Sequence, residues 1–109
     1  MNIVMENYQG FPVIAPEGEI DMFNSKELRS AIEGVIEKDQ ARLILDMKSV
    51  KLLDSSGIAV LVSLKRKLDT MGGCMKLVHL HPDVSRVLDI TGLLPYLDIF
   101  SDMNSAVSE

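Results

Sequence analysis

The chain has 109 residues, 47% of them apolar and 25% charged, a composition typical of one ordinary globular domain spanning residues 1–109. Its 16 acidic side chains against 11 basic ones give a net charge of −5, which argues against a nucleic-acid partner because phosphate backbones are bound by clustered Lys and Arg. The single cysteine excludes an internal disulfide, and no stretch is long and apolar enough to span a bilayer. We therefore expect a cytoplasmic monomer with no membrane partner.

The chain opens with a pattern typical of a β-hairpin. Residues 3–8 and 11–15 carry β-branched and aromatic side chains and flank the two-residue turn Gln9-Gly10. Pro12 has no N–H group to donate to a strand ladder. We therefore expect the hairpin to lie at or near a sheet edge.

A helix and a buried strand are expected next. Asn24, followed three residues later by Glu27, resembles a capping box at the start of the helix. Apolar residues then recur at the spacing of one helix face, at Leu28, Ala31, Ile32 and Val35. Residues 42–47 contain the continuous apolar run Leu-Ile-Leu, which favours a strand covered on both faces.

The remaining chain continues to alternate between helices and strands. We expect a helix over residues 56–67, a strand over 74–80 and a third helix that begins at residue 82 and is stopped by Gly92. A last strand over 97–100 and a terminal helical turn over 104–108 follow. The order is β-β-α-β-α-β-α-β with a final α. Such alternation implies crossover connections, and so an α/β domain whose mixed, mostly parallel sheet begins with the hairpin and carries the helices.

The stretch Asp54-Ser55-Ser56-Gly57 is the most informative part of the chain. It follows a buried strand and opens an apolar helix, and ligands and partners of α/β sheets gather at such carboxyl ends of strands. The free N–H groups of a helix start tolerate a phosphate. However, Asp, Ser and Gly are also what an ordinary helix start contains, with Ser55 or Ser56 as the cap, and local physics alone favours that plain reading.

Five short motifs follow one another along the chain: Gly18-Glu19-Ile20-Asp21, Leu43-Ile44-Leu45-Asp46, Asp54-Ser55-Ser56-Gly57, Gly72-Gly73 and Thr91-Gly92-Leu93. In order and spacing they resemble the STAS domain family, and most closely the standalone anti-sigma-factor antagonists of bacterial partner-switching systems. The resemblance covers essentially the whole chain.

This resemblance implies a phosphorylation switch at Ser55. The first serine of the Asp-Ser-Ser-Gly motif is the one modified in that family, and Asp54 and Asp21 match aspartates near the site. The unphosphorylated protein is expected to bind an anti-sigma factor that is itself a serine kinase, and so to release the kinase's target. Phosphorylation ends the binding, and a separate serine phosphatase resets the switch. The chain itself is then neither kinase nor phosphatase and needs no cofactor.

Residues besides Asp21 and Asp54 are also expected to shape the partner surface. Ser56 is an alternative acceptor, although the cap is its more ordinary role. Gly57 lets a partner backbone approach closely. Asn24 flanks the surface or simply caps its helix, and Met22, next to Asp21, could contact a partner.

Other motifs favour structural roles. His79-x-His81 has no third metal ligand nearby, so we expect no metal site there. Lys65-Arg66-Lys67 is expected to be solvated near the carboxyl end of its helix. The nucleophile elbow, the P-loop and the dinucleotide fingerprint are absent, so we expect no enzyme. Two alternatives remain: a scaffold subunit of a larger assembly, such as a lipid-transport complex, without a switch, and a small-molecule sensor.

Overall fold

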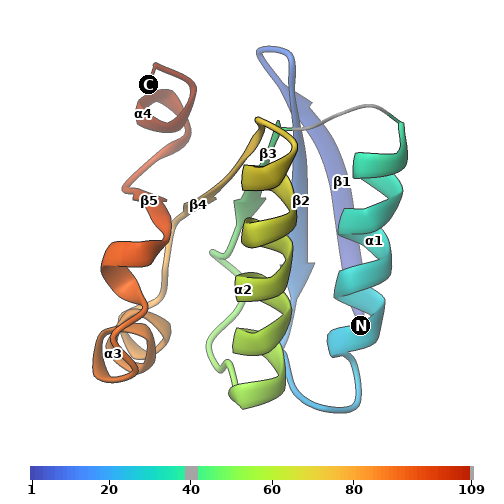
Figure 1. Ribbon diagram of the computed structural model, residues 1–109. Coiled ribbons are helices and arrows are strands. Elements are labelled where there is room, and N and C mark those ends of the chain that lie inside the picture. Colours follow the sequence, from blue (N-terminus) through green and yellow to red (C-terminus); the bar gives the residue numbers. More distant parts are fainter. Residues whose placement is uncertain (39–41, 109) are drawn as a thin grey trace.

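The computed structural model describes residues 1–38 and 42–108, which form a mixed β-sheet with helices on both faces (Figure 1). The strands are β1 (Asn2–Tyr8), β2 (Phe11–Glu17), β3 (Arg42–Asp46), β4 (Cys74–Val78) and β5 (Asp98–Phe100). The helices are α1 (Ser25–Glu37), α2 (Ser55–Thr70), α3 (Pro82–Ile90), α4 (Met103–Ser108) and the short 3-10 helix η1 (Leu94–Tyr96). The expected order of elements is confirmed, including the final helix.

The sheet has the strand order β1-β2-β3-β4-β5, and only the β1–β2 pair is antiparallel. The turn between these two strands has positive φ at both Gln9 and Gly10, as the right-handed twist of a tight hairpin requires. β1 is an edge strand, which confirms the expected place of the hairpin. β2 pairs with β3 through Val13 and Ile14, so its prolines lie outside that ladder.

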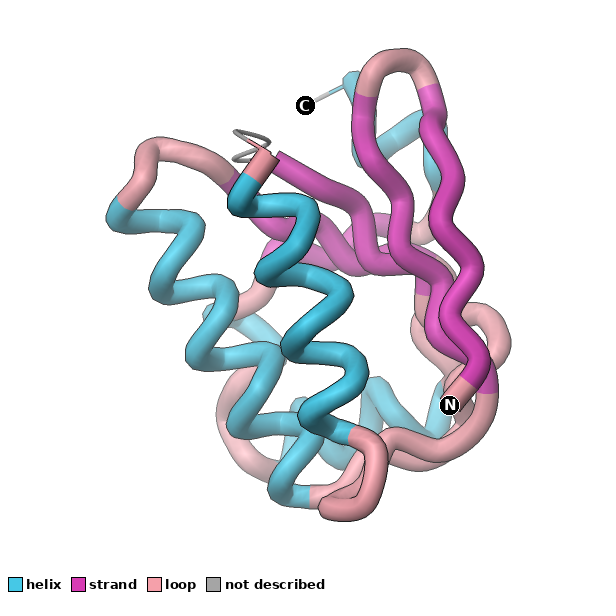
Figure 2. Tube along the Cα trace, turned by 90° about the vertical axis from the view of Figure 1, so that its right-hand side faces the viewer, coloured by secondary structure: helices cyan, strands magenta, loops and turns pink. Residues whose placement is uncertain are grey.

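Alternate residues of the strands serve the two faces of the sheet. On one face, buried side chains of β2, β3 and β4 pack against α1 and α2, which lie side by side in Figure 1: Ile14, Leu43, Leu45, Met75 and Leu77. On the other face, Val13, Ile44 and Val78 pack against Ala106 of α4. Figure 2 shows α4 on the opposite side of the strands from α1 and α2.

The parallel strands bring two loops to one end of the sheet. β2, β3 and β4 run in the same direction, so the loops that follow β2 and β3 meet where α1 and α2 begin, at the lower end of Figure 1. α2 begins at Ser55 and is longer than expected at both ends, whereas β4 ends at Val78 because His79 adopts a left-handed φ of 58° and turns the chain.

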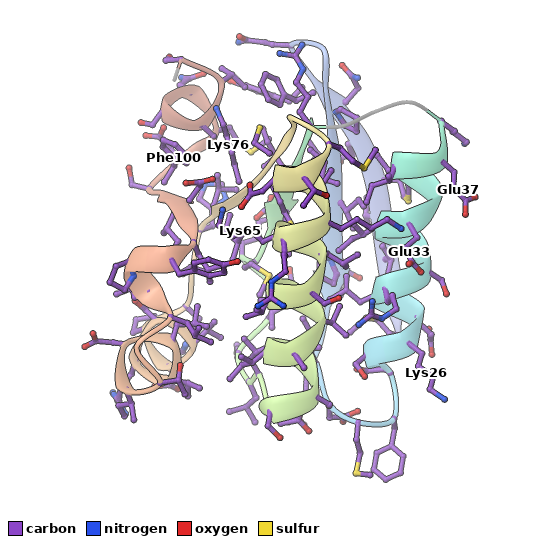
Figure 3. All side chains as sticks on the ribbon, viewed as in Figure 1. Lys26, Glu33, Glu37, Lys65, Lys76 and Phe100 are labelled. Carbon is purple, nitrogen blue, oxygen red and sulfur yellow. The ribbon has the colours of Figure 1, made fainter. Side chains whose placement is uncertain are left out.

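Lys65 is buried, which contradicts the expectation that it is solvated. Its Nζ lies 2.9 Å from Asp69 Oδ2, 3.8 Å from Asp98 Oδ2 and 5.1 Å from the centre of the Tyr96 ring. The hydrogen bond to Asp69 raises the pKa of Lys65 above its ordinary value. Lys65 therefore links α2 to the strand β5 (Figure 3).

Candidate functional site

The loop before α1 and the loop before α2 are joined by a short parallel β-bridge. The Ile20 N–H donates to the Leu52 carbonyl at 3.0 Å, and the Asp54 N–H donates to the Ile20 carbonyl at 3.1 Å. The side chains of Ile20 and Leu53 are buried in the core. The bridge therefore places Asp21 and Asp54, which follow these buried residues directly, on neighbouring segments.

Asp54 is the N-terminal cap of α2. Its Oδ1 accepts hydrogen bonds from the Ser56 N–H at 2.9 Å, the Gly57 N–H at 3.1 Å and the Ser56 hydroxyl at 2.5 Å. The expectation that Ser55 or Ser56 caps this helix is therefore wrong, because one carboxylate satisfies both backbone donors. The Ser56 hydroxyl, and then the Gly57 N–H, lower the pKa of Asp54 below its ordinary value.

The two serines differ in accessibility. Ser55 is the first residue of α2, is exposed, and its hydroxyl makes no hydrogen bond to the part of the chain that the structure describes. Ser56 is half-buried, and its hydroxyl is held by Asp54. A group that attacks a phosphoryl donor has to be reachable and free, and of the two hydroxyls that of Ser55 meets both conditions.

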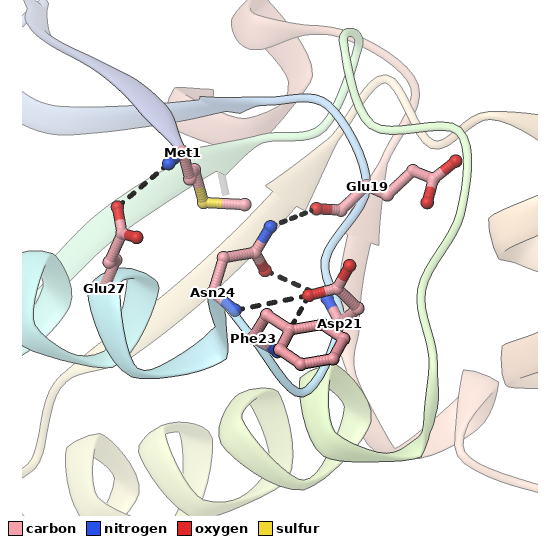
Figure 4. Close-up of polar contacts among 6 residues, drawn as sticks. All are labelled: Met1, Glu19, Asp21, Phe23, Asn24 and Glu27. Atoms are coloured by element: carbon pink, nitrogen blue, oxygen red, sulfur yellow. Dashed lines mark hydrogen bonds and ion pairs between the residues drawn. The ribbon is translucent and has the colours of Figure 1, made fainter.

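The side chains of Asp21 and Asn24 form hydrogen bonds within the loop before α1. Asp21 Oδ1 accepts from the Phe23 N–H at 2.9 Å and from the Asn24 N–H at 3.2 Å. In return, Asn24 Oδ1 accepts from the Asp21 N–H at 2.9 Å, and Asn24 Nδ2 donates to the Glu19 carbonyl at 2.7 Å (Figure 4). Both side chains therefore hold the loop in one conformation.

These contacts overturn the predicted capping box of α1. Asn24 occupies the cap position, but its side chain makes no capping hydrogen bond because the loop already uses both ends of its amide. Glu27 does not reach back to Asn24. Its carboxylate instead lies 3.0 Å from the amino group of Met1 (Figure 4).

Asp54 also connects the start of α2 to the loop before α1. Its second oxygen, Oδ2, accepts from the Met22 N–H at 3.1 Å. Met22 and the next residue, Phe23, expose 68% and 87% of their surface. Met22 was expected to contact a partner, whereas Phe23 is a second exposed apolar residue that was not expected. The available signal was an apolar pair inside a loop of Gly, Asp and Asn, where core residues are not expected.

Gly57 is required by packing within this chain. A Cβ atom at this position would lie 2.5 Å from Leu53 Cδ1 and 2.7 Å from Ile20 Cγ2. The glycine is buried, and it lets α2 pack directly on the bridge between the two loops. The chain's own core therefore requires a glycine here, and the close approach of a partner backbone stays a prediction.

His79 and His81 have separate structural partners. His79 Nδ1 lies 3.0 Å from Asp46 Oδ1, and His81 Nδ1 accepts from the Asp83 N–H at 3.2 Å and so caps α3. Within residues 1–38 and 42–108 there is no group of three acidic, His or Cys side chains placed to hold a metal ion, and no pocket. No helix in these ranges is long and apolar enough to cross a membrane.

The fold and the site together define a small α/β domain whose candidate site is an exposed surface at the start of one helix. The family model of the STAS domain matches residues 2–106, and the chain belongs to this family.

Relatives with similar sequences are named anti-sigma factor antagonists. The anti-sigma F factor antagonist of Paenibacillus polymyxa is 28% identical over 110 residues, covering 100% of this chain and 94% of the relative. The anti-sigma-B factor antagonist of Bacillus subtilis is 33% identical over 90 residues, covering 83% and 82%. The anti-sigma factor antagonist SpoIIAA in its unphosphorylated form has the same fold, with a TM-score of 0.79, 23% identity and coverage of 97% and 93%. The phosphorylated form of SpoIIAA from Bacillus matches with a TM-score of 0.72, 22% identity and coverage of 98% and 97%.

Proposed function

We propose that this chain is an anti-sigma factor antagonist that is switched by phosphorylation of Ser55. In its unphosphorylated form it binds an anti-sigma factor with serine kinase activity and releases the target of that factor. The observation that carries the proposal is the hydroxyl of Ser55, which is exposed and unbonded at the start of α2 while its neighbour Ser56 is held by Asp54. The names of the relatives, and the existence of SpoIIAA in two phosphorylation states, support it.

The proposal assigns the surrounding residues to the partner surface. Asp21 and Asn24 shape the loop before α1, and Asp54, Ser56 and Gly57 shape the start of α2. The chain acts in the cytoplasm as a binding protein rather than an enzyme. The kinase transfers the phosphoryl group to it, and a separate serine phosphatase removes that group.

The position of Ser55 makes the phosphate effective as a negative switch. A phosphoserine adds about −1.5 to −2 charges at neutral pH. The N–H groups of Ser56 and Gly57 already bond to the carboxylate of Asp54, so the phosphate would meet a like charge beside it rather than free donors. A repelled or unpaired charge at the centre of an interface costs about 2–5 kcal/mol. That is a loss of affinity of roughly thirtyfold to several-thousandfold.

Two baits test the switch directly. Ser55→Ala and Ser55→Asp chains would be used in parallel for pull-downs from native lysate. We expect only the Ser55→Ala bait to capture a serine kinase. The captured kinase, produced in pure form and given ATP, should then phosphorylate wild-type chain at Ser55, as mapped by mass spectrometry.

The control variant is Ser56→Ala, which keeps Ser55 and should still be phosphorylated. Capture of the same proteins by both baits, with equal affinity, would contradict the switch and favour a scaffold subunit that binds its assembly regardless of phosphorylation. Transfer of phosphate to Ser56 rather than Ser55 would overturn the choice of acceptor.

A further inference from the structure

The loop before α1 exposes two adjacent large apolar side chains. Phe23 exposes 87% of its surface and Met22 exposes 68%. Leu52, which exposes 51%, lies on the other loop, and its carbonyl accepts the hydrogen bond of the bridge at Ile20. Scattered exposed apolar residues need no explanation, but Met22 and Phe23 are adjacent in the chain and both expose most of their surface, and contiguous exposed apolar surface marks interaction sites.

The backbone that carries this pair is held in place. The Met22 N–H donates to Asp54 Oδ2 at 3.1 Å, and the Phe23 N–H donates to Asp21 Oδ1 at 2.9 Å. Asn24 braces the same loop through the Asp21 N–H. Two carboxylates thus fix the main chain while both side chains remain outside the core. A loop held in this way loses little conformational freedom when a partner covers it.

The hydrogen bonds of Asp54 also tie the loop of the apolar pair to the helix start that carries Ser55. One of its oxygens holds the Met22 N–H and the other holds the start of α2, where Ser55 is the first residue. The apolar pair and the serine therefore belong to one continuous surface. A kinase that reached the Ser55 hydroxyl would therefore come close to the loop that carries Met22 and Phe23.

We infer that Met22 and Phe23 form an apolar anchor, which inserts into an apolar pocket beside the active site of the kinase that modifies Ser55. The inference rests on the proposed function and adds to it the residues that supply binding energy. Aromatic side chains buried at the centre of an interface supply a large share of its affinity, whereas most surrounding contacts only exclude water. The anchor thus supplies affinity for the kinase, and the phosphate on Ser55 lowers that affinity.

The test uses the purified kinase obtained with the Ser55→Ala bait. Its dissociation constant for the chain would be measured by titration calorimetry without ATP, for wild type, Met22→Ser, Phe23→Ser and the control Ile90→Ser. Ile90 exposes 77% of its surface at the end of α3, so it matches the anchor in exposure but lies on a different element. We expect both anchor variants to weaken binding about tenfold or more, and the control to change it by less than about twofold. Thermal unfolding of each variant should stay close to that of wild type, because neither anchor side chain is in the core.

The outcomes separate the anchor from the switch. If Ser55→Asp abolishes binding while Phe23→Ser binds like wild type, the anchor is wrong and the proposed function stands. If Ser55→Asp and wild type bind equally, or wild type does not bind the kinase, the proposed function fails and the anchor fails with it. If the anchor variants bind the kinase normally but abolish a dimer of wild-type chain in analytical ultracentrifugation, the pair contacts a second copy of this chain, and the inference is overturned.

Discussion

A methyl group added at Gly57 would clash with the side chains of Leu53 and Ile20, which lie at the bridge between the two loops. The new Cβ atom would lie 2.5 Å from Leu53 Cδ1 and 2.7 Å from Ile20 Cγ2, and both side chains are buried. Overpacking costs about 1–3 kcal/mol, and the better helix propensity of alanine offsets up to about 1 kcal/mol of it. We therefore expect Gly57→Ala to lower the free energy of unfolding by about 1–2 kcal/mol.

Gly34→Ala is the matched control for this variant. Gly34 lies in the interior of α1, and a Cβ atom there would meet nothing within 4 Å. Alanine should therefore raise the free energy of unfolding by about 0.5–1 kcal/mol through its helix propensity alone. Urea unfolding monitored by circular dichroism measures both variants. If Gly57→Ala also raised the free energy of unfolding, the bridge would be shown to accommodate the extra methyl group without strain.

Asp54 is expected to keep its charge at a more acidic pH than an ordinary aspartate. The hydroxyl of Ser56 and then the N–H of Gly57 stabilise the carboxylate and lower the pKa of Asp54 from its ordinary 3.8. Because the folded pKa is below the unfolded one, Asp54 contributes stability above the unfolded pKa. That contribution is lost as the pH falls through the folded pKa, below about pH 4.

Carbon NMR of the Asp54 carboxyl group across the acidic range measures this titration. The midpoint should lie below 3.8 in wild type. Ser56→Ala is the informative control, because it removes the hydroxyl donor and leaves the backbone donors in place. In this variant the pKa of Asp54 should move back toward 3.8. A wild-type midpoint at or above that value would mean that Asp54 does not hold the helix start as described.

At the scale of elements, the helix starts show where sequence patterns fail. The apolar spacing predicted α1, but the pair Asn24 and Glu27 suggested a capping box that the structure does not contain. At α2 the polar residues were recognised, but the cap was assigned to a serine and not to Asp54. Local residue types specify that a helix begins. Which oxygen caps it depends on competing donors: the Asp21 N–H occupies Asn24 Oδ1 at α1, whereas Asp54 Oδ1 takes the Ser56 and Gly57 N–H groups at α2.

Long-range contacts account for the other misses. Lys65 looks like a solvated lysine in its own helix, yet Asp98 and Tyr96, about thirty residues further along the chain, help to bury it. The exposure of Phe23 has only a weak sequence signal, its place beside Met22 in a loop of polar residues, because an aromatic residue beside a helix start is more often a core residue. In both cases the decisive neighbours are set by the tertiary fold and not by local pattern.

At the scale of the whole molecule, the topology was predictable for a simple physical reason. Alternating strands and helices need crossover connections, and these force parallel pairing, whereas the two-residue turn at Gln9-Gly10 forces one antiparallel pair. The strand directions follow these two rules. The proximity of the two loops that carry Asp21 and Asp54 was also predictable, because parallel strands bring their following loops to one end of the sheet. The bridge between Ile20 and Leu53 that aligns the two loops carries no sequence signature.

We expect the phosphate on Ser55 to act on the interface and leave the fold intact. Ser55 is exposed and contributes nothing to the core, so the added charge meets mainly Asp54 and solvent. Interactions of exposed charges, with each other or with a helix terminus, amount to about 1 kcal/mol or less. For a domain of this length such a change shifts the melting temperature by no more than about 4–8 °C.

Chain carrying phosphoserine at position 55 would be compared with unmodified chain by calorimetry and by NMR amide spectra, at low and high salt. The melting temperatures should converge at high salt, because exposed charges are screened over a Debye length of about 3 Å at 1 M ionic strength. Loss of dispersed amide resonances in the phosphorylated chain would instead mean that the switch works by unfolding. A domain of marginal stability tolerates a loss of about 1 kcal/mol in its free energy of unfolding. The same charge costs an interface about 2–5 kcal/mol of binding free energy. A phosphate at an exposed helix start can therefore release a partner while the protein stays folded, so that removal of the phosphate restores binding.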